Sequence, residues 1–246
     1  VSYPGYDNNR LANTADSAYL AKLGSDRSKP LWNYATQQKT APGSTFKMVS
    51  SVAGVEEGVI NINTVIDCEG SFTKLNGTIH NCWIYPGSHG PLTLSGAIQN
   101  SCNYFFYEVG YRLADDDGRY NDAYGIERLS KYATMFGLGQ TTGVEIAESE
   151  PNISDQYPVA SAIGQGTHNY TTVGLARYVS AVANKGTVYQ LSLIKEIRNA
   201  DGVTTYSGKN KIVNEIMLDP SLWNSIHTGM MRVVADKKYF NDIGII

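Results

Sequence analysis

The sequence predicts an α+β protein that is mostly helical and has few strands. Two observations lead to this fold class. Several segments have helical spacing of apolar residues or the residues that begin and end helices, whereas only one segment alternates as paired strands do. The chain has 246 residues, of which 42% are hydrophobic and 17% are charged. That composition is typical of a globular protein with enough chain to bury a sizeable core.

The first strong helical pattern covers residues 44–58, STFKMVSSVAGVEEG. Its apolar side chains fall at helical spacing: Phe46, Val49, Val52 and Val55. Gly58 is the residue type that most often follows a helix end. We therefore expect a buried helix here, with Ser44 at its N-cap, where a serine oxygen can accept a backbone hydrogen bond.

Later segments predict more helices and one strand pair. The helical segments are 92–113 with a polar interruption at 101–103, then 121–136, 171–186 and 219–236. Pro220 suits the first position of the last helix. Residues 191–206 alternate around Asn-Ala-Asp-Gly and predict a β-hairpin. Residues 61–91 contain four glycines and little periodicity, so we expect a loop-rich segment there.

Charge and hydropathy exclude some classes of protein. The net charge is −3, with both signs scattered along the chain, whereas binding to nucleic acid needs a basic face. No apolar run approaches the roughly 18 residues that span a bilayer, and the N-terminus lacks the pattern of a signal peptide. We expect any membrane anchor to lie outside this chain. The apolar ending, residues 243–246, suggests truncation, because free ends usually lie in water.

Ser44 and Lys47 form an S-x-x-K pattern. Three residues apart in a helix, they share a face. A serine hydroxyl needs a neighbouring base to act as a nucleophile, and a lysine can be that base if burial lowers its pKa. The helix N-terminus adds backbone N–H groups that suit an oxyanion. The alternative is that Ser44 only caps a helix and Lys47 is solvated, because S-x-x-K alone arises often by chance.

The surroundings of this pattern favour the catalytic interpretation. The apolar helix that follows Pro42 and Gly43 carries Lys47 toward the core, and a buried lysine without a role is costly. Ser101 and Asn103 then supply an S-x-N pattern at the interruption between two predicted helices. S-x-x-K, S-x-N and a later K-T/S-G are the three motifs of a known set of serine acyl-transfer enzymes.

The sequence resembles the transpeptidase domain of penicillin-binding proteins, most closely those of class B. The likeness covers nearly the whole chain, in SYPGYDNN (2–9), PLWNYATQQKTAPGSTFKMVSSVAGVEEGVI (30–60), HGPLTLSGAIQNSCNYFFYEVG (89–110), FGLG (136–139) and AIGQGTHNYTTVGLARYVSAVANKGTVY (162–189). It implies the α+β fold of serine β-lactamases and penicillin-binding transpeptidases. We expect residues 1–246 to form one such domain, with a mainly helical subdomain and an incomplete antiparallel sheet subdomain.

The resemblance implies a peptidoglycan D,D-transpeptidase and a role for each motif residue. Ser44 would attack the penultimate D-Ala carbonyl of a stem peptide, or a β-lactam carbonyl, and Lys47 would take its proton. Ser101 would relay a proton to the leaving group together with Lys47. Asn103 would bind the substrate amide and help to hold Lys47. The Ser44 N–H would form half of the oxyanion hole, and an amine of a neighbouring strand would accept the acyl group. This chemistry requires no cofactor and no metal.

The resemblance also implies a location and partners. We expect the protein at the extracytoplasmic face of the bacterial cell membrane, held by an anchor outside this chain. Its partners would be peptidoglycan stem peptides, β-lactam antibiotics and other cell-wall synthesis proteins, and not nucleic acid.

One motif of the family is missing from the sequence. In the family, Lys-Thr/Ser-Gly follows a segment similar to residues 235–246, and neither 185–187 nor 237–239 replaces it, because their order and context differ. The strands that precede Val1 in the family are absent as well. The missing strand normally binds the substrate carboxylate and supplies the second oxyanion donor. We therefore expect this chain alone to be acylated slowly or not at all.

Two other functions stay open at this stage. A class D β-lactamase also has a Ser-Thr-Phe-Lys helix, but its second motif is typically Ser-x-Val, and Asn103 stands at that place here. A β-lactam sensor or silent cell-wall scaffold would keep the acylation of Ser44 without peptide turnover. The lifetime of the acyl-enzyme separates a transpeptidase from a lactamase, and a cross-linking assay separates a transpeptidase from a sensor.

Cysteine and histidine residues cluster in the glycine-rich segment. Cys68, His80, Cys82 and His89 lie within 22 residues. Free thiols, a Cys68–Cys82 disulfide and a four-ligand zinc site are the competing interpretations. Cys102 is expected to be a packed small side chain between helices.

Two features further along the chain are candidates for a binding or catalytic role, and the sequence favours a structural role for the first and does not require a catalytic role for the second. Residues 164–166, Gly-Gln-Gly, lack the strand and the Lys-Ser/Thr that a phosphate loop needs, which favours a structural turn beside the cleft. His168 is an acid–base candidate that chemistry between a serine and a lysine does not need.

Overall fold

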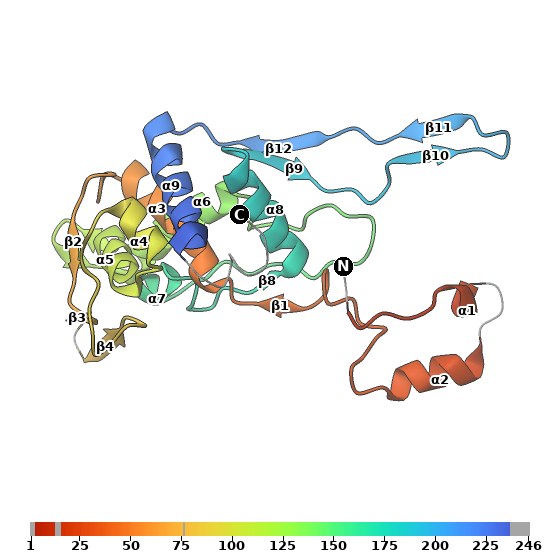
Figure 1. Ribbon diagram of the computed structural model, residues 1–246, viewed down its shortest axis with the longest axis horizontal. Helices are drawn as coiled ribbons and strands as arrows, with labels where there is room; N and C mark the ends of the chain where they lie inside the picture. The colour runs from red at the N-terminus through yellow and green to blue at the C-terminus, as the bar shows by residue number, and fades with distance from the viewer. Residues whose placement is uncertain (1–2, 13–15, 76, 237–246) are drawn as a thin grey trace.

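Helices packed around α3 (Lys47–Glu56) and α5 (Asn103–Leu113) form the body of the protein in the computed structural model (Figure 1). The structure describes residues 3–12, 16–75 and 77–236. The other helices are α1 (Asn9–Ala12), α2 (Ser17–Ser25), the 3-10 turn η1 (Gly43–Phe46), α4 (Leu94–Gln99), α6 (Asp122–Met135), α7 (Pro158–Ser161), α8 (Thr172–Ala183) and α9 (Pro220–Asp236).

The strands of the described residues form antiparallel pairs and no larger sheet. The pairs are β1 (Lys39–Thr40) with β8 (Tyr170–Thr171), β2 (Ile66–Cys68) with β5 (Gly90–Leu92), β3 (Ser71–Leu75) with β4 (Thr78–Asn81), β6 (Asp115–Asp116) with β7 (Arg119–Tyr120), β9 (Thr187–Gln190) with β12 (Lys211–Glu215), and β10 (Glu196–Arg198) with β11 (Thr204–Ser207). The fold is therefore α+β with a helical core, as the sequence predicts.

The predicted helices are present, with small differences at their ends. The segment predicted as one helix over 44–58 begins as η1, continues as α3 and ends at Glu56. The polar interruption at 101–103 separates α4 from α5, and Pro220 opens α9 as expected. The prediction that Ser44 is the N-cap is wrong. Pro42 precedes η1 without a side-chain cap, and Ser44 lies inside this turn.

The segment 61–91 differs most from its prediction. It contains four short strands, β2 to β5, in place of a featureless loop. β2 pairs with β5, more than 20 residues away, through Ile66 opposite Leu92. Strands of three residues are too short to show alternation in the sequence, and their partners become adjacent only when the chain folds.

The core surrounds α3, most of whose side chains are small or apolar. Phe46, Val49 and Val52 are fully buried and belong to one cluster with side chains of α5, α6, α8 and α9. Two buried serines on α3 have hydrogen-bond partners, because Ser50 Oγ donates to Ala162 O at 2.7 Å and Ser51 Oγ to Lys47 O at 2.7 Å. A helix buried on most of its faces carries Lys47 at its first position into the interior.

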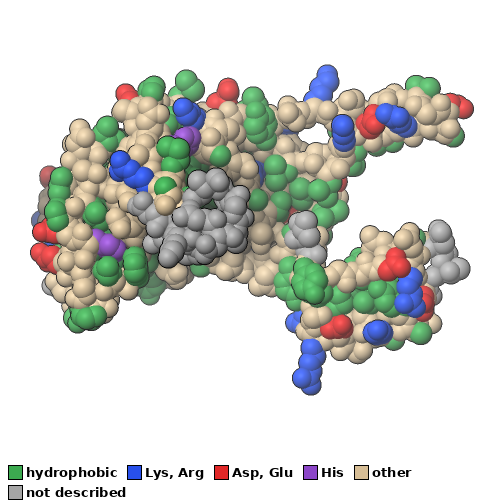
Figure 2. Space-filling model, viewed as in Figure 1, with side chains coloured by type: hydrophobic (Ala, Val, Ile, Leu, Met, Phe, Trp, Pro, Cys, Tyr) green, Lys and Arg blue, Asp and Glu red, His purple; other side chains and the backbone are tan. Residues whose placement is uncertain are grey.

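Two segments project from the helical body on the same side in Figure 1. One is the long arm of β9, β12 and the β10–β11 hairpin, and the other holds α1 and α2. Every residue of β10 and β11 is exposed. Figure 2 shows basic and acidic side chains mixed over the face in view. Within residues 3–12, 16–75 and 77–236, no helix has both the length and the apolar character of a membrane span.

Two glycines bring distant segments into direct backbone contact below Ser44. Gly43, the first residue of η1, donates its N–H to Gly164 O at 3.0 Å. A Cβ atom at Gly164 would lie 2.0 Å from Gly43 O, and the residue has φ +75°. Only glycine combines this backbone conformation with so close an approach. The Gly-Gln-Gly segment thus packs against the turn that carries Ser44.

We predict that Gly164→Ala destabilises the protein by about 3–5 kcal/mol, because it adds an overlap with backbone to a strained φ. Gly58→Ala is the matched control, since Gly58 has φ +70° and open space around its Cβ position, so it should lose only about 1–2 kcal/mol. Urea unfolding measures both values. Equal losses in the two variants would contradict the contact with Gly43.

Candidate active site

Lys47 lies at the centre of the candidate site. Its side chain is 1% exposed. The Nζ atom is 2.7 Å from Ser101 O, 3.1 Å from Ser101 Oγ and 2.7 Å from Asn103 Oδ1. The structure therefore brings Lys47 together with Ser101 and Asn103, which are more than 50 residues away in the sequence, as the motif set predicts.

Ser44 is on the same side of the turn as Lys47. Residues three apart in a 3-10 turn eclipse one another, and the Lys47 N–H donates to Ser44 O at the end of η1. The Ser44 side chain is exposed, and its hydroxyl has no hydrogen bond within the described residues. Because Ser44 lies in the first turn of the η1–α3 helix, its backbone N–H has no partner inside that helix. Ser44 thus offers both an accessible hydroxyl and a backbone N–H that no group of its own helix uses.

Burial sets the protonation of Lys47. It lowers the pKa of the amine from its ordinary value to about 8, and the nearby Cys102 and Cys82 oppose part of this effect. The three hydrogen-bond partners of Nζ are neutral oxygens, which stabilise an ammonium less than a carboxylate would. The amine is therefore partly unprotonated near neutral pH, which a general base requires.

The S-x-N turn is held in an unusual backbone conformation. Ser101 has φ +46°, a region that few residues other than glycine adopt. The turn is closed by Ser101 N donating to Ile98 O and by Cys102 N donating to Ala97 O, both at 2.9 Å. The Trp83 indole N–H also donates to Ser101 O at 3.1 Å. Trp83 lies in the segment predicted as loop, so the sequence offered no signal for this contact.

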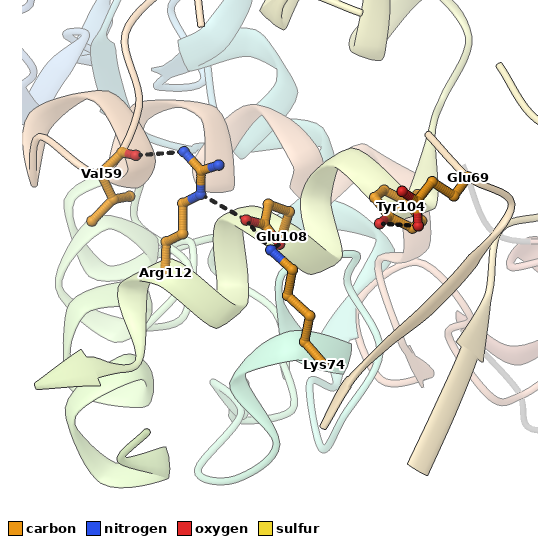
Figure 3. A network of polar contacts seen from close by, with 6 residues as sticks. All are labelled: Val59, Glu69, Lys74, Tyr104, Glu108 and Arg112. Carbon is orange, nitrogen blue, oxygen red and sulfur yellow. Dashed lines mark hydrogen bonds and ion pairs between the residues drawn. The ribbon is translucent and has the colours of Figure 1, made fainter. Parts of the chain in front are cut away.

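A polar network fixes α5, the helix that begins at Asn103 (Figure 3). The buried Glu108 carboxylate accepts from Arg112 Nε at 2.9 Å and from Lys74 Nζ at 2.8 Å. Arg112 also donates to Val59 O at 3.2 Å. Lys74 belongs to β3, and Val59 follows α3. The network therefore ties α5 to the segments around it and, through α5, sets where Asn103 meets Lys47.

His168 lies in the core, away from Lys47's polar partners. Its ring packs on Phe46 of η1 with centroids 4.2 Å apart. Burial lowers the pKa of His168 to about 4, so the ring is neutral at pH 7. Its Nδ1 accepts a hydrogen bond from Ser154 N at 3.0 Å. These contacts give the residue a packing role beneath η1.

Three free thiols and one imidazole meet beside the S-x-N turn. The Sγ atoms of Cys68, Cys82 and Cys102 and a ring nitrogen of His89 all lie within 4.8 Å of one another. His89 Nδ1 is 3.5 Å from Cys68 Sγ and 3.6 Å from Cys82 Sγ, and Cys82 Sγ is 4.0 Å from Cys102 Sγ. Ligands around one tetrahedral zinc ion are about 3.5–3.8 Å apart. The donor set and spacing therefore fit zinc.

This group corrects the ligand set that the sequence suggested. His80 is not in it, and its ring packs on Tyr107 instead, with centroids 5.2 Å apart. Cys102, expected only as a packed side chain, takes that place. It is fully buried, and its Sγ also accepts from Phe105 N at 3.5 Å as the N-cap of α5. The only sequence signal for Cys102 as a ligand was its place in the S-x-N motif, close in the chain to the segment 61–91 that holds the other cysteines.

Comparisons with known proteins agree with this architecture. The model of the penicillin binding protein transpeptidase domain matches residues 1–242. A peptidoglycan D,D-transpeptidase MrdA of Haemophilus influenzae is 32% identical over 244 residues, which are 93% of this chain and 34% of the relative. The stage V sporulation protein D of Bacillus subtilis is 29% identical over 220 residues, which are 86% of this chain and 31% of that protein.

Solved structures share the fold. The crystal structure of Pseudomonas aeruginosa PBP2 in complex with WCK 5153 has a TM-score of 0.79 at 27% identity, and the match covers 95% of this chain and 51% of that one. A chain of a peptidoglycan synthase complex that coordinates polymerization and crosslinking has a TM-score of 0.81 at 27% identity, covering 100% of this chain and 41% of that one.

The extent of these matches settles the family. This chain spans about a third of the length of the curated relatives that it matches. Within that span, the family model covers nearly every residue and the MrdA relative exceeds 30% identity, so the chain belongs to the penicillin-binding protein transpeptidase domain family.

Proposed function

We propose that this protein is a peptidoglycan D,D-transpeptidase whose nucleophile is Ser44. The observation that carries the proposal is the hydrogen bonding of the buried Lys47 amine to Ser101 and Asn103. An amine with a pKa of about 8, one turn from an exposed serine, is suited to remove a hydroxyl proton.

The residues have distinct roles in the proposed reaction. Ser44 Oγ attacks the carbonyl of the penultimate D-Ala as its proton passes to Lys47 Nζ, and the Ser44 N–H stabilises the oxyanion. The C–N bond then breaks, and Ser101 relays the proton from Lys47 to the departing D-Ala amine. Asn103 binds the substrate amide and keeps Lys47 in position.

The second half of the reaction uses the same groups in reverse. An amine of a neighbouring strand attacks the acyl carbonyl, and its proton returns through Lys47 to Ser44 Oγ as the ester bond breaks. The product is a cross-linked peptide and a free enzyme. A β-lactam would acylate Ser44 by the same first step, with the ring amide as the bond that opens.

Two alternatives remain as outcomes of an experiment. A class D-like β-lactamase would release the acyl group within seconds, whereas a transpeptidase would hold a β-lactam for hours. A sensor or scaffold would be acylated but would form no cross-links. Relatives named as D,D-transpeptidases favour the transpeptidase, and so does Asn103 in place of the valine that is typical of class D.

We also infer the setting in which this reaction takes place. The substrate lies outside the cytoplasm, so the protein acts at the extracytoplasmic face of the bacterial membrane. One solved structure similar to this chain is part of a complex that coordinates polymerization and crosslinking. That likeness supports other cell-wall synthesis proteins as partners.

We predict that Ser44→Ala abolishes covalent labelling of the full-length protein, and not only of the 246-residue chain, by a fluorescent penicillin, because the acyl acceptor is lost. Thr45→Ala is the matched control, since Thr45 is the adjacent exposed hydroxyl, and it should keep more than about half of the labelling rate, as expected of a surface substitution. Gel fluorescence and intact mass measure both. Labelling of Ser44→Ala at the normal rate would refute this nucleophile.

The acylation rate should follow the titration of Lys47. The base must be unprotonated, and its protonated fraction falls as pH rises through its pKa of about 8. We therefore expect the second-order rate constant for penicillin to rise about tenfold per pH unit below pH 8 and to level off above it.

Asn103→Asp tests the assignment of this titration. A carboxylate at 2.7 Å from Nζ would stabilise the ammonium and move the midpoint upward by about 1 unit or more. A rate profile that is flat from pH 6 to pH 9, or a midpoint that does not move in this variant, would show that Lys47 is not the base. Reagent hydrolysis without protein is measured at each pH as the control.

We propose, as a second function of this chain, that Cys68, Cys82, Cys102 and His89 bind one zinc ion. The specific observation is the convergence of four buried or half-buried ligand atoms within 4.8 Å of one another. Zinc would offset two of the three thiolate charges and join β2, the segment after β4, the segment before β5 and the S-x-N turn. Its role would be structural, because all four positions are filled by protein ligands.

We predict that the protein, stripped of metal with a chelator, takes up one zinc ion and becomes more stable, by about 2.7 kcal/mol when zinc is 100 times its dissociation constant. His89→Ala should weaken binding at least about tenfold, whereas His80→Ala should leave it unchanged. Competition with a chromophoric chelator measures the affinity. An equal effect of the two variants, or no uptake, would refute this site.

A further inference from the structure

A cavity of about 700 Å³ opens on the side of α5 and α7. Its size is in the range of small-molecule sites, about 300–1,000 Å³. Segments far apart in the sequence line it: β3 and β4, the end of α5, β7 and α7. Its principal lining residues are Lys74, His80, Tyr111, Tyr120, Asp122 and Tyr157.

Aromatic rings with polar edges line this cavity together with the aliphatic side chains of Leu75, Val159 and Ala160. Tyr111 and Tyr120 stack with centroids 5.2 Å apart and an interplanar angle of 21°. Lys74 Nζ lies 5.8 Å from the Tyr111 ring centre while it pairs with Glu108, as Figure 3 shows for the latter contact. Tyrosines with a lysine and an aspartate at their edges suit a ligand that has one apolar face and many polar groups.

Tyr157 has a backbone conformation that its size does not favour. It has φ 59° and ψ 65°, in the left-handed region, and its side chain is 58% exposed. This conformation costs a bulky residue about 1–2 kcal/mol relative to glycine. An exposed ring adds little to the core, so packing does not account for a tyrosine at this position. Such strain is concentrated at binding and catalytic sites.

The cavity lining includes residues of segments that also pack against the candidate active site. Gly166 lines it and follows Gly164, which contacts Gly43 beside Ser44. His80 lines it as well and packs on Tyr107, one turn after Asn103 on α5. The cavity is thus built partly from the segments whose other residues contact the turn of Ser44 and form α5 after Asn103.

We propose that this cavity binds an N-acetylated sugar of the glycan strand that carries the stem peptide, an inference that rests on the proposed function. The C–H face of a pyranose ring stacks on tyrosine rings, and its hydroxyl and acetamido groups hydrogen-bond to the polar edge. A wholly apolar ligand would take the hydroxyls of Tyr111 and Tyr157 out of water without offering them a hydrogen bond. Lys74 would keep Glu108 as its partner, and Tyr120 would keep Asp122. The enzyme would thus hold the donor strand by its sugar as well as by its peptide.

The test measures binding of an N-acetylglucosamine tetramer to the intact protein by isothermal titration calorimetry. Tyr157→Gly removes the ring and suits the positive φ, so the variant should fold, and its melting temperature checks this. We expect its affinity for the tetramer to fall at least tenfold. Tyr206→Ala is the matched control, because Tyr206 is similarly exposed at 47% but lies on β11 in the projecting arm, and it should bind as the unchanged protein does.

Penicillin labelling of the unchanged full-length protein is measured in parallel, so that a failure of the transpeptidase proposal is seen separately from a failure at the cavity. No binding of the tetramer, or equal affinity in the Tyr157 and Tyr206 variants, would overturn the sugar site. So would binding of a free stem pentapeptide that Tyr157→Gly weakens tenfold while the tetramer does not bind.

Discussion

The meeting of Lys47 with the S-x-N turn is the constraint on which the rest of the candidate site depends. A lysine that is 1% exposed and bonded to three neutral oxygens cannot be placed by local structure alone. It needs α3 to be buried on most of its faces and α5 to begin at one defined point. Burial lowers the amine's pKa, and the hydrogen bonds fix its direction, so the same packing supplies both the chemistry and the geometry of a base.

Several long-range contacts hold that geometry, and each depends on a residue that no local sequence pattern singles out. Gly164 lets the chain touch Gly43 below the turn of Ser44. Glu108 anchors α5 to β3, and its partner Arg112 anchors α5 to the segment after α3. Trp83 donates to the strained turn at Ser101. Because interiors are close-packed, a shift in any of them would be transmitted to Lys47.

Cys102 links the candidate active site to the thiol cluster. Its neighbours in sequence, Ser101 and Asn103, both contact Lys47, while its own Sγ caps α5 and faces Cys82. A metal ion bound there would hold the S-x-N turn through Cys102, the residue between the two that contact Lys47. The tyrosine-lined cavity borders the same helix, so α5 is a shared wall of all three features, and its position affects each of them.

The sequence by itself determined the local elements and the family. Apolar periodicity predicted the helix around α3, and start and stop residues predicted those around α6, α8 and α9. The motifs at Ser44 and Ser101 with their collinear neighbours identified the transpeptidase domain. Only the tertiary structure decided which residues meet across the fold. In the structure, Cys102 and not His80 joins Cys68, Cys82 and His89. The short strands within 61–91 form pairs, and Tyr157 lines a cavity. The spacing of apolar residues shows which face of a single helix or strand is buried. It does not show which distant segments come into contact, because those contacts leave no repeating pattern in the sequence.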